Sequence, residues 1–507
     1  MADLAVLKRK LAKKYGLSIL SNVNLLKAYH TFCHKKRKKP DKNIEIILRK
    51  RLVRSLSGVA VVSVLTKPYP CPGKCLYCPT EKGMPKSYLS NEPAAMRAVL
   101  NNFDPARQVK NRLESLALQG HPTDKIELII IGGTWSFFPK SYKNWFVKRC
   151  FEAFNADSPG QQTKTLATAQ KMNEKSKHRV IGITIETRPD YINAREIRHL
   201  RELGVTRIEM GVQSVFDDVL KYNLRGHTID DVVTATKMLK NAGFKICYHI
   251  MPNLPGSTPK KDKDAFTNLF FGQAFQPDLL KIYPCAILKN APLYKLWLKG
   301  KYKPYTEKKL VNLLLEIKKT IPFYCRIQRL TRDIPSQSIV TGPAKVSNMR
   351  QVLEKLSAEQ GWRCKCIRCR EVKGNYNEKE SLYLYRQDYN ASDGKEIFLS
   401  YENKTRTHLY SLLRLRVPSK PFLFPVLKDS SIIRELHTYG QLHPLGVIAI
   451  SPQHKGLGKK LIKQAEQISR KDFRLKKISV ISGIGARGYY KKLGYRLEDT
   501  YMTKKLY

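Results

Sequence analysis

Three cysteines in the first hundred residues have the types and spacing of a metal-binding loop. Cys71, Cys75 and Cys78 form a C-x3-C-x2-C pattern, with Tyr77 directly before the last cysteine. Three thiolates on so short a loop can hold a 4Fe-4S cluster and leave one iron open. The open iron could chelate S-adenosylmethionine (SAM), whose reductive cleavage gives a 5′-deoxyadenosyl radical. A structural zinc site is the alternative, but zinc normally takes four protein ligands and no fourth Cys or His lies close by in sequence.

A second cysteine group lies later in the chain. Cys364, Cys366 and Cys369 supply three closely spaced thiolates, and Cys325 could supply a fourth if the chain folds back. Four thiolates would close a structural zinc site, and a second iron–sulfur cluster is the alternative. We therefore expect two metal sites, and no disulfide framework in a reducing compartment.

A glycine-bearing loop near the C-terminus has the features of a CoA-binding turn. Gln453 and Gly456 precede a helix that is predicted over Leu457–Arg470, and Gly458 is the second residue of that helix. Glycines allow backbone N–H groups to approach a pyrophosphate, and a helix N-terminus favours its negative charge. GNAT acetyltransferases hold acetyl-CoA in this way.

The segment 484–495 supports that assignment. It ends in an aromatic-x-x-x-Gly-Tyr pattern, which is typical of the last helix and strand of the GNAT fold. Tyr489 or Tyr490 could donate a proton to the leaving CoA thiolate. Either could instead merely pack, and the sequence does not distinguish them.

The elements that position the cysteine triad are strands alternating with helices. Such alternation predicts parallel strands with helical crossovers, here an α/β fold with a partial, six-unit β/α barrel. The loops after barrel strands form active sites. We therefore expect Gly132 and Gly133, after the second strand, and Glu186, after the third, to contact SAM. The predicted strands are Val59–Leu65, Ile126–Ile131, Val180–Ile185, Arg207–Val212, Lys245–Met251 and Leu279–Tyr283.

The C-terminal part predicts a smaller α+β domain with a mainly antiparallel sheet. Its apolar runs are shorter and enclose the single clear helix at Leu457–Arg470. The predicted strands are Ser381–Tyr385, Ile397–Tyr401, Leu409–Leu415, Val447–Ile450 and Ile478–Ile481.

The charge of the chain points to a polyanionic partner. Lys and Arg number 93 against 42 Asp and Glu, for a formal net charge of +51. Nucleic acid is the best candidate, and generally Lys-rich proteins in the source lineage are the alternative. The first 54 residues carry sixteen Lys or Arg and three acidic residues, interleaved with apolar residues, which predicts basic helices that contact phosphate.

Targeting and membrane signals are not evident in the sequence. We find no run of about 18 apolar residues and no secretory h-region after the basic N-terminus. We therefore expect a cytoplasmic protein without a membrane association.

The two motif-bearing regions together resemble one known family. From about residue 59 to the end, the chain resembles the catalytic subunit of the Elongator complex and its stand-alone archaeal and bacterial relatives. The compact triad spacing is that of the stand-alone relatives, which act without accessory subunits. Shared strings include 91–93, 96–98, 103–105, 185–190, 211–214, 280–284, 332–335, 366–371 and 434–437.

The resemblance implies a set of site residues. It assigns Cys71, Cys75 and Cys78 to a 4Fe-4S cluster with SAM, and makes Lys281 a functional barrel residue. Zinc ligands would be Cys325, Cys364, Cys366 and Cys369. Acetyl-CoA contacts would be Lys125, Glu435, Leu436, His437, Thr438, Leu457, Gly458, Lys459 and Tyr490.

The basic N-terminal segment and the resemblance together predict the domain order. Residues 1–55 would be a basic helical segment that binds tRNA, and 56–290 the radical SAM domain. A linker with the zinc site would follow at 291–372, and the GNAT domain at 373–507.

The implied reaction is carboxymethylation of tRNA at C5 of the wobble uridine, position 34. The radical would take hydrogen from the acetyl methyl group of acetyl-CoA, and the carbon radical would add to the base. An anticodon stem-loop and an electron donor for the cluster are the implied partners. The rival is a protein lysine acetyltransferase with a structural iron–sulfur domain, and a second rival is a tRNA-binding scaffold without turnover.

Overall fold

A seven-stranded parallel sheet forms the larger part of the molecule. The computed structural model describes residues 2–16, 18–48, 58–156, 162–346, 348–373, 380–440 and 456–507. Neighbouring strands follow the chain order from β1 to β7 without a reversal, so the sheet curls into an open barrel rather than a doubly wound layer. The strands are β1 (Ala60–Leu65), β2 (Lys125–Ile131), β3 (Arg179–Thr187), β4 (Arg207–Gln213), β5 (Lys245–Ile250), β6 (Leu279–Ile282) and β7 (Arg326–Arg329).

The six predicted barrel strands are confirmed, and the count of six units is corrected to seven. β7 has the sequence Arg-Ile-Gln-Arg, and pairs in parallel with β6. Three of its four residues are polar, so no apolar run marked it. It lies within the segment that we expected to be a linker.

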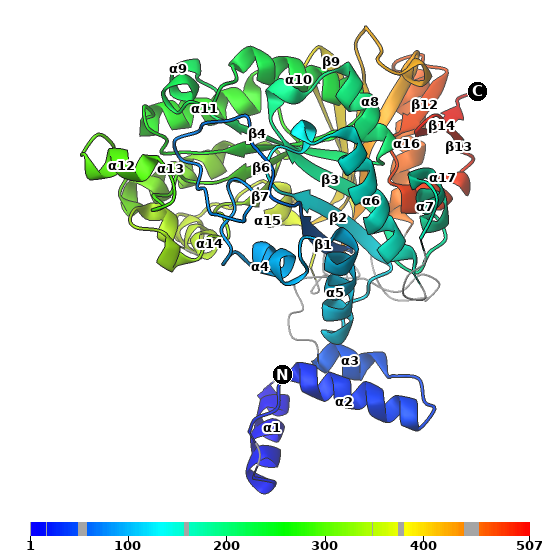
Figure 1. Cartoon of the computed structure of the whole chain (residues 1–507). Coiled ribbons are helices and arrows are strands. Elements are labelled where there is room, and N and C mark those ends of the chain that lie inside the picture. The colour runs from blue at the N-terminus through cyan, green and yellow to red at the C-terminus, as the bar shows by residue number, and fades with distance from the viewer. Residues whose placement is uncertain are drawn as a thin grey trace.

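Helices cover the outside of this sheet (Figure 1). Their ends follow ordinary capping rules: Asp104 caps α5 ahead of Pro105, and Thr228 forms a capping box with Asp231 at the start of α10. The helices are α4 (Pro93–Leu100), α5 (Pro105–Leu118), α6 (Lys140–Asn155), α7 (Leu166–Asn173), α8 (Ala194–Glu202), α9 (Asp217–Tyr222), α10 (Ile229–Asn241), α11 (Pro259–Phe271), α12 (Leu293–Leu298), α13 (Glu307–Thr320), α14 (Met349–Glu359) and α15 (Ile367–Arg370).

The C-terminal part forms a second, mixed sheet. Its order is β13-β14-β12-β11-β10-β9-β8, antiparallel except for the parallel pair β11 and β12, which α16 (Leu457–Lys471) connects. The predicted α+β domain is thus confirmed, while Val447–Ile450 lies outside the described residues. The strands are β8 (Tyr383–Ala391), β9 (Gly394–Glu402), β10 (Leu409–Val417), β11 (Ser430–Thr438), β12 (Lys477–Val480), β13 (Arg496–Glu498) and β14 (Tyr501–Lys505), and α17 spans Arg487–Lys491.

The two sheets share a buried boundary rather than a flexible linker. One hydrophobic cluster contains side chains of both parts, among them Phe244 from the barrel and Ile432 and Ile481 from the second sheet. The approach is close: a Cβ on Gly483 would lie 2.0 Å from the carbonyl oxygen of Ile181 in β3. Packing this tight holds both sheets in one fixed arrangement.

Buried ion pairs cross the same boundary. Asp278, next to β6, accepts from Arg434 of β11 at 3.0 Å and contacts Arg414 of β10 at 3.6 Å. Lys245 of β5 pairs with Glu435 of β11 at 3.1 Å. Burial by itself raises the pKa of the Asp278 carboxyl, but Arg434 and Arg414 outweigh it and hold the pKa below its usual range.

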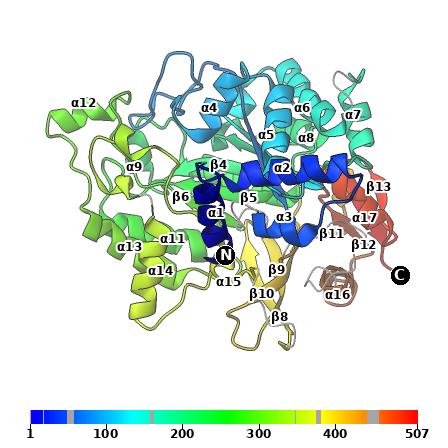
Figure 2. The same ribbon diagram turned by 90° about the horizontal axis from the view of Figure 1, so that it is seen from below.

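Three N-terminal helices project from the body beneath α5 (Figures 1 and 2). They are α1 (Ala2–Lys14), α2 (Asn22–Lys35) and α3 (Lys42–Leu48), and α2 contacts α5. The segment is helical, as its apolar spacing predicted. Among the described residues, no helix has the length and apolar character needed to cross a membrane.

Candidate active site

A cavity of about 990 Å³ opens at the carboxyl ends of the barrel strands. Seven residues singled out from sequence line this one cavity, although they come from four different segments. They are Cys71, Cys75, Cys78, Gly132, Gly133, Glu186 and Lys281. The three cysteines and the two glycines belong to loops that follow β1 and β2, as expected for a barrel site, whereas Glu186 and Lys281 lie within β3 and β6.

The cysteine loop fits a cluster better than a single ion. The sulfur atoms of Cys364, Cys366 and Cys369 lie within 4.8 Å of one another, as ligands of one ion must, and the described residues Cys71, Cys75 and Cys78 form no such close group. They nevertheless face one cavity. Three separated thiols around a common space are the donor set that a 4Fe-4S cluster with one open iron requires.

Buried positive groups surround the same loop. Arg225, almost fully buried, donates from Nη1 to the Cys75 sulfur at 3.7 Å and from Nη2 to the Gly211 carbonyl at 2.6 Å. Burial raises the pKa of the Cys78 thiol to about 11, and the neighbouring Cys75 adds to this. The buried cations can therefore stabilise thiolates that the apolar surroundings would otherwise keep protonated.

Gly132 is a position where only glycine fits. Its φ is +150°, and a Cβ there would lie 2.1 Å from the Thr66 hydroxyl at the end of β1. Gly133, by contrast, has open space where a Cβ would stand. The turn therefore brings bare backbone to the cavity wall beside the cysteine loop, which suits close approach of a ligand's amino group.

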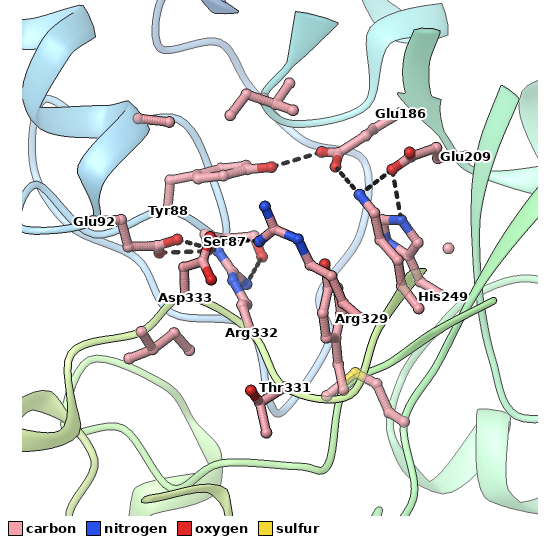
Figure 3. Close-up of a pocket in the computed structure, with 18 of the residues that line it drawn as sticks. Ser87, Tyr88, Glu92, Glu186, Glu209, His249, Arg329, Thr331, Arg332 and Asp333 are labelled. Carbon is pink, nitrogen blue, oxygen red and sulfur yellow. Dashed lines mark hydrogen bonds and ion pairs between the residues drawn. The ribbon is translucent and has the colours of Figure 1, made fainter. Parts of the chain in front are cut away.

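Lys281 stands at the centre of a charged network in the cavity. Three side chains of this network, Glu186, Glu209 and His249, point toward one another in Figure 3. The Lys281 ammonium contacts the Glu209 carboxylate directly and lies 3.7 Å from Glu186. His249 bonds Glu209 through Nε2 at 3.0 Å, and the Tyr88 hydroxyl donates to Glu186 at 2.6 Å. Five side chains from five segments are thus connected by hydrogen bonds and by the Lys281–Glu186 ion pair.

The network keeps Lys281 charged. Burial by itself lowers the pKa of Lys281, but the adjacent Glu209 carboxylate outweighs burial and raises the pKa above its usual value. For Glu209, burial raises the pKa, whereas Lys281 and the His249 hydrogen bond bring it below the usual range. Lys281 is therefore a fixed hydrogen-bond donor rather than a base.

Arginines form the opposite wall of the cavity. Arg332 donates to the Ser87 hydroxyl at 2.8 Å and to the Glu92 carboxylate at 3.0 Å, and Arg329 pairs with Asp333 at 2.5 Å (Figure 3). Further arginines, Arg97, Arg112, Arg350 and Arg368, line the same cavity. Such a wall suits a ligand with several phosphates.

The second cysteine group lies beside β7, away from the first. Cys364, Cys366 and Cys369 are close enough for one metal ion, and Cys325 is not part of that close group. Its backbone carbonyl accepts a hydrogen bond from Ile367 N at 3.0 Å, which places Cys325 next to the loop. Four-thiolate zinc binding stays a prediction.

The predicted CoA-binding turn is described from Gly456 onward, and Gln453 lies outside the described residues. Gly456 caps α16 with a φ of +68°, a conformation that favours glycine. A Cβ on Gly458 would lie 3.2 Å from the Tyr489 hydroxyl and 3.7 Å from both Leu436 and Thr438. The N-terminus of α16, β11 and α17 therefore meet at one point.

Strand alternation divides the predicted acetyl-CoA residues of β11 into two sets. Leu436 and Thr438 face the Gly458 turn. Glu435 instead pairs with Lys245 and Arg414 at the boundary with the barrel. The His437 ring stacks on the Tyr439 ring, with 4.3 Å between the ring centroids. The predicted contacts therefore do not all share one face.

The remaining candidates differ in exposure. Tyr490 is buried in the core of the second sheet, whereas Tyr489 is 38% exposed with its hydroxyl at the turn. Lys459 is exposed on α16, and half-buried Lys125 begins β2. The structure thus favours Tyr489 over Tyr490 as the residue that faces a ligand.

The sequence analysis missed several residues of the site. For those on β4 and β5, the alternation of polar and apolar residues could have identified them. In β4, Arg207, Glu209 and Gly211 alternate with apolar residues, and in β5 Lys245, Cys247 and His249 do the same. Polar residues at every second strand position face the barrel interior. Tyr88, Arg225 and Arg332 come from loops and carry no comparable signal.

Comparison with known proteins agrees with this geometry. Family models match the radical SAM superfamily at residues 69–267, the radical SAM C-terminal domain at 277–358 and the acetyltransferase (GNAT) family at 430–495. A relative named tRNA uridine(34) acetyltransferase from Methanocaldococcus jannaschii is 45% identical, over 91% of this chain and 87% of the relative. Human Elongator complex protein 3 is 38% identical, over 99% of this chain and 93% of the relative.

A solved structure extends the likeness to three dimensions. The archaeal Methanocaldococcus infernus Elp3 with an N-terminal deletion of residues 1–46 matches with a TM-score of 0.78 and 41% identity. The match covers 89% of this chain and all of that chain. Both sheets therefore have counterparts in a known protein.

Proposed function

Because the chain belongs to the family of tRNA uridine(34) acetyltransferases and Elongator complex protein 3, we propose that it modifies the wobble uridine, position 34, of tRNA. We propose further that the product carries a carboxymethyl group at C5, with acetyl-CoA as the carbon source. One observation supports this proposal most strongly. The same chain contains a barrel cavity lined by cysteines and a turn of the type that binds CoA.

The cavity residues support radical chemistry on a base. When bound, a 4Fe-4S cluster with SAM supplies a 5′-deoxyadenosyl radical, which can take hydrogen from an unreactive acetyl methyl group. Cys71, Cys75 and Cys78 would hold the cluster, and Gly132 and Gly133 would let SAM approach the backbone. Lys281, held charged by Glu209, donates a hydrogen bond to an acceptor such as a uracil carbonyl.

The arginine wall supports an RNA ligand. Arg329, Arg332 and Arg350 line the cavity and can contact the phosphates of an anticodon loop. Bases in RNA loops can splay outward into a protein pocket, which brings a wobble base within reach of Lys281. The basic helices α1 and α2 extend the phosphate-binding surface, so tRNA affinity should fall steeply with salt.

The second sheet supports CoA binding and thioester release. The backbone of Gly456, Leu457, Gly458 and Lys459 at the start of α16 suits the pyrophosphate. The Tyr489 hydroxyl lies at that turn and can protonate a leaving thiolate, since burial raises its pKa and keeps it protonated at neutral pH. A structural zinc on Cys364, Cys366 and Cys369, with Cys325 as fourth ligand, completes the proposed cofactors.

The lysine acetyltransferase alternative finds less support in the structure. Such chemistry usually needs a general base beside the acceptor amine. Glu435 on β11 is bound by Lys245 and Arg414, and these cations outweigh burial and hold its pKa below the usual range. A carboxylate so held is a poor base.

Nucleoside analysis tests the proposal. Reduced, cluster-loaded protein is incubated with SAM, acetyl-CoA and tRNA, and the digested RNA is analysed by mass spectrometry. We expect carboxymethyluridine from the wild-type chain and none from Cys75→Ala. Cys150→Ala is the matched control, because Cys150 is buried in α6 outside the cavity and should leave the product unchanged. Acetylated peptide with unmodified RNA would support the rival instead.

A further inference from the structure

Arg188 occupies an unusual position beside the cysteine loop. It follows β3, is 5% exposed and lines the large cavity. Two of its three guanidinium nitrogens are satisfied by Asp190: Nε donates to Oδ1 at 2.9 Å and Nη2 donates to Oδ2 at 2.7 Å. This bidentate pairing fixes the plane of the guanidinium group and leaves Nη1 pointing away from the carboxylate.

The third nitrogen, Nη1, is buried and has no hydrogen-bond partner. A buried guanidinium nitrogen without an acceptor is costly, so such an atom usually marks a partner that the protein alone does not provide. A second buried guanidinium adds to the local donors, because Arg225 donates to the Cys75 sulfur at 3.7 Å. The local surplus of donors therefore calls for an electron-rich group.

Gly73 shows where that group would be. A Cβ built on Gly73 would lie 2.6 Å from Arg188 Nη1, 3.5 Å from the Cys75 sulfur and 3.8 Å from the Cys71 sulfur. Glycine at this position lets the guanidinium reach the loop between two of the three thiols. Any larger residue would push Arg188 away from the sulfur atoms.

From this geometry we propose that Arg188 is a hydrogen-bond donor to the sulfur atoms of the iron–sulfur site, and that it raises the site's reduction potential. The inference rests on the proposed function, since it requires a cluster on Cys71, Cys75 and Cys78. Asp190 is the positioning residue, because it aims Nη1 at the loop. Hydrogen bonds to cluster sulfurs and nearby net charge are established determinants of cluster potential.

The sign of the effect follows from electrostatics. Reduction adds one negative charge to the cluster, and an N–H donor with positive charge stabilises the reduced form more than the oxidised form. Replacing Arg188 removes that donor and leaves Asp190 as an unpaired anion near the cluster. Replacing Asp190 by its amide removes the anion and leaves the cation, so the two changes should shift the potential in opposite directions.

A redox titration followed by electron paramagnetic resonance tests the inference on cluster-loaded, full-length protein without SAM. We expect Arg188→Gln to lower the reduced-to-oxidised ratio at a fixed potential about tenfold, a shift of about −59 mV for one electron. Asp190→Asn should raise the ratio, and Arg188→Lys should lie between Arg188→Gln and the wild-type chain. Iron content reports whether each variant retains its cluster.

Several outcomes would overturn the inference. Unchanged potentials in both variants, or shifts of the same sign, would show that Arg188 does not act on the cluster. If Arg188→Gln fails to retain a cluster, Asp190→Asn decides: a higher potential supports the inference and an equal or lower one refutes it.

The test separates this inference from the proposed function. A wild-type protein that binds no cluster after reconstitution would contradict the proposed function itself. A wild-type protein that binds a cluster and modifies tRNA, with variants of unaltered potential, would contradict only the role of Arg188.

Discussion

The charge of Asp278 should hold the two sheets together. Its carboxylate is fully buried, accepts from Ile246 N at 2.9 Å and pairs with Arg434 and Arg414. The surrounding network holds five basic and three acidic side chains, so neutralising one carboxylate leaves five cations against two. The cations are Lys240, Lys245, Arg414, Arg416 and Arg434, and the other acidic residues are Glu396 and Glu435.

We expect Asp278→Asn to lower the free energy of unfolding by about 3–5 kcal/mol, the cost of breaking a buried ion pair from one side. Asp388→Asn is the matched control. Asp388 also pairs with an arginine, Arg386, but those side chains are 30% and 39% exposed, so its loss should cost about 0.2–1 kcal/mol.

Urea unfolding followed by circular dichroism measures both variants. Because Asp278 joins the sheets, its loss should also separate the unfolding of the two sheets into distinct transitions. A destabilisation by Asp278→Asn of under about 1 kcal/mol, equal to that of the control, would refute the claim that these ion pairs fasten the second sheet to the barrel.

Three further predictions concern the Gly458 turn, the boundary between the two sheets and the stability of the protein at low pH. Tyr489→Phe should slow tRNA-stimulated CoA release, because the Tyr489 hydroxyl lies at the Gly458 turn. Tyr490→Phe should mainly lower the melting temperature, because Tyr490 lies in the core. Equal effects of both changes on CoA release would contradict this prediction. Gly483→Ala should cost at least about 1–3 kcal/mol in thermal unfolding, since its Cβ would meet backbone of β3, while Gly488→Ala, with open space, should not destabilise. For Asp278 and Glu435, burial raises the pKa but the paired cations hold it below the unfolded value. The stability that they contribute is therefore complete above about pH 5 and is lost as pH falls further. A urea midpoint that stayed constant from pH 5 to about 3 would contradict the last prediction.

The sequence predicted the barrel well where strands are continuous apolar runs. β2, Lys-Ile-Glu-Leu-Ile-Ile-Ile, could hardly be another element, whereas β7, Arg-Ile-Gln-Arg, has no pattern of its own and exists because β6 offers it an edge. A strand can therefore be predicted from its own sequence only when its own side chains form the buried surface.

The site was only partly predictable for the same reason. The cysteine spacing of 71, 75 and 78 is local, and it indicated a cluster loop without any structure. The partners of Glu435 and Lys281 lie far along the chain, at Lys245 and Glu209, so their charge states follow from tertiary packing alone. Which of two adjacent tyrosines faces the turn depends on the rotation of α17, which sequence periodicity over five residues cannot determine.

Isotope transfer tests the central claim most directly. Acetyl-CoA with a fully deuterated methyl group is supplied to the cluster-loaded chain with SAM and tRNA, and both the nucleosides and 5′-deoxyadenosine are analysed by mass spectrometry. The account predicts one deuterium in 5′-deoxyadenosine and a carboxymethyluridine that keeps the other two. Modified uridine that contains all three deuterium atoms, or 5′-deoxyadenosine without deuterium alongside full modification, would contradict it.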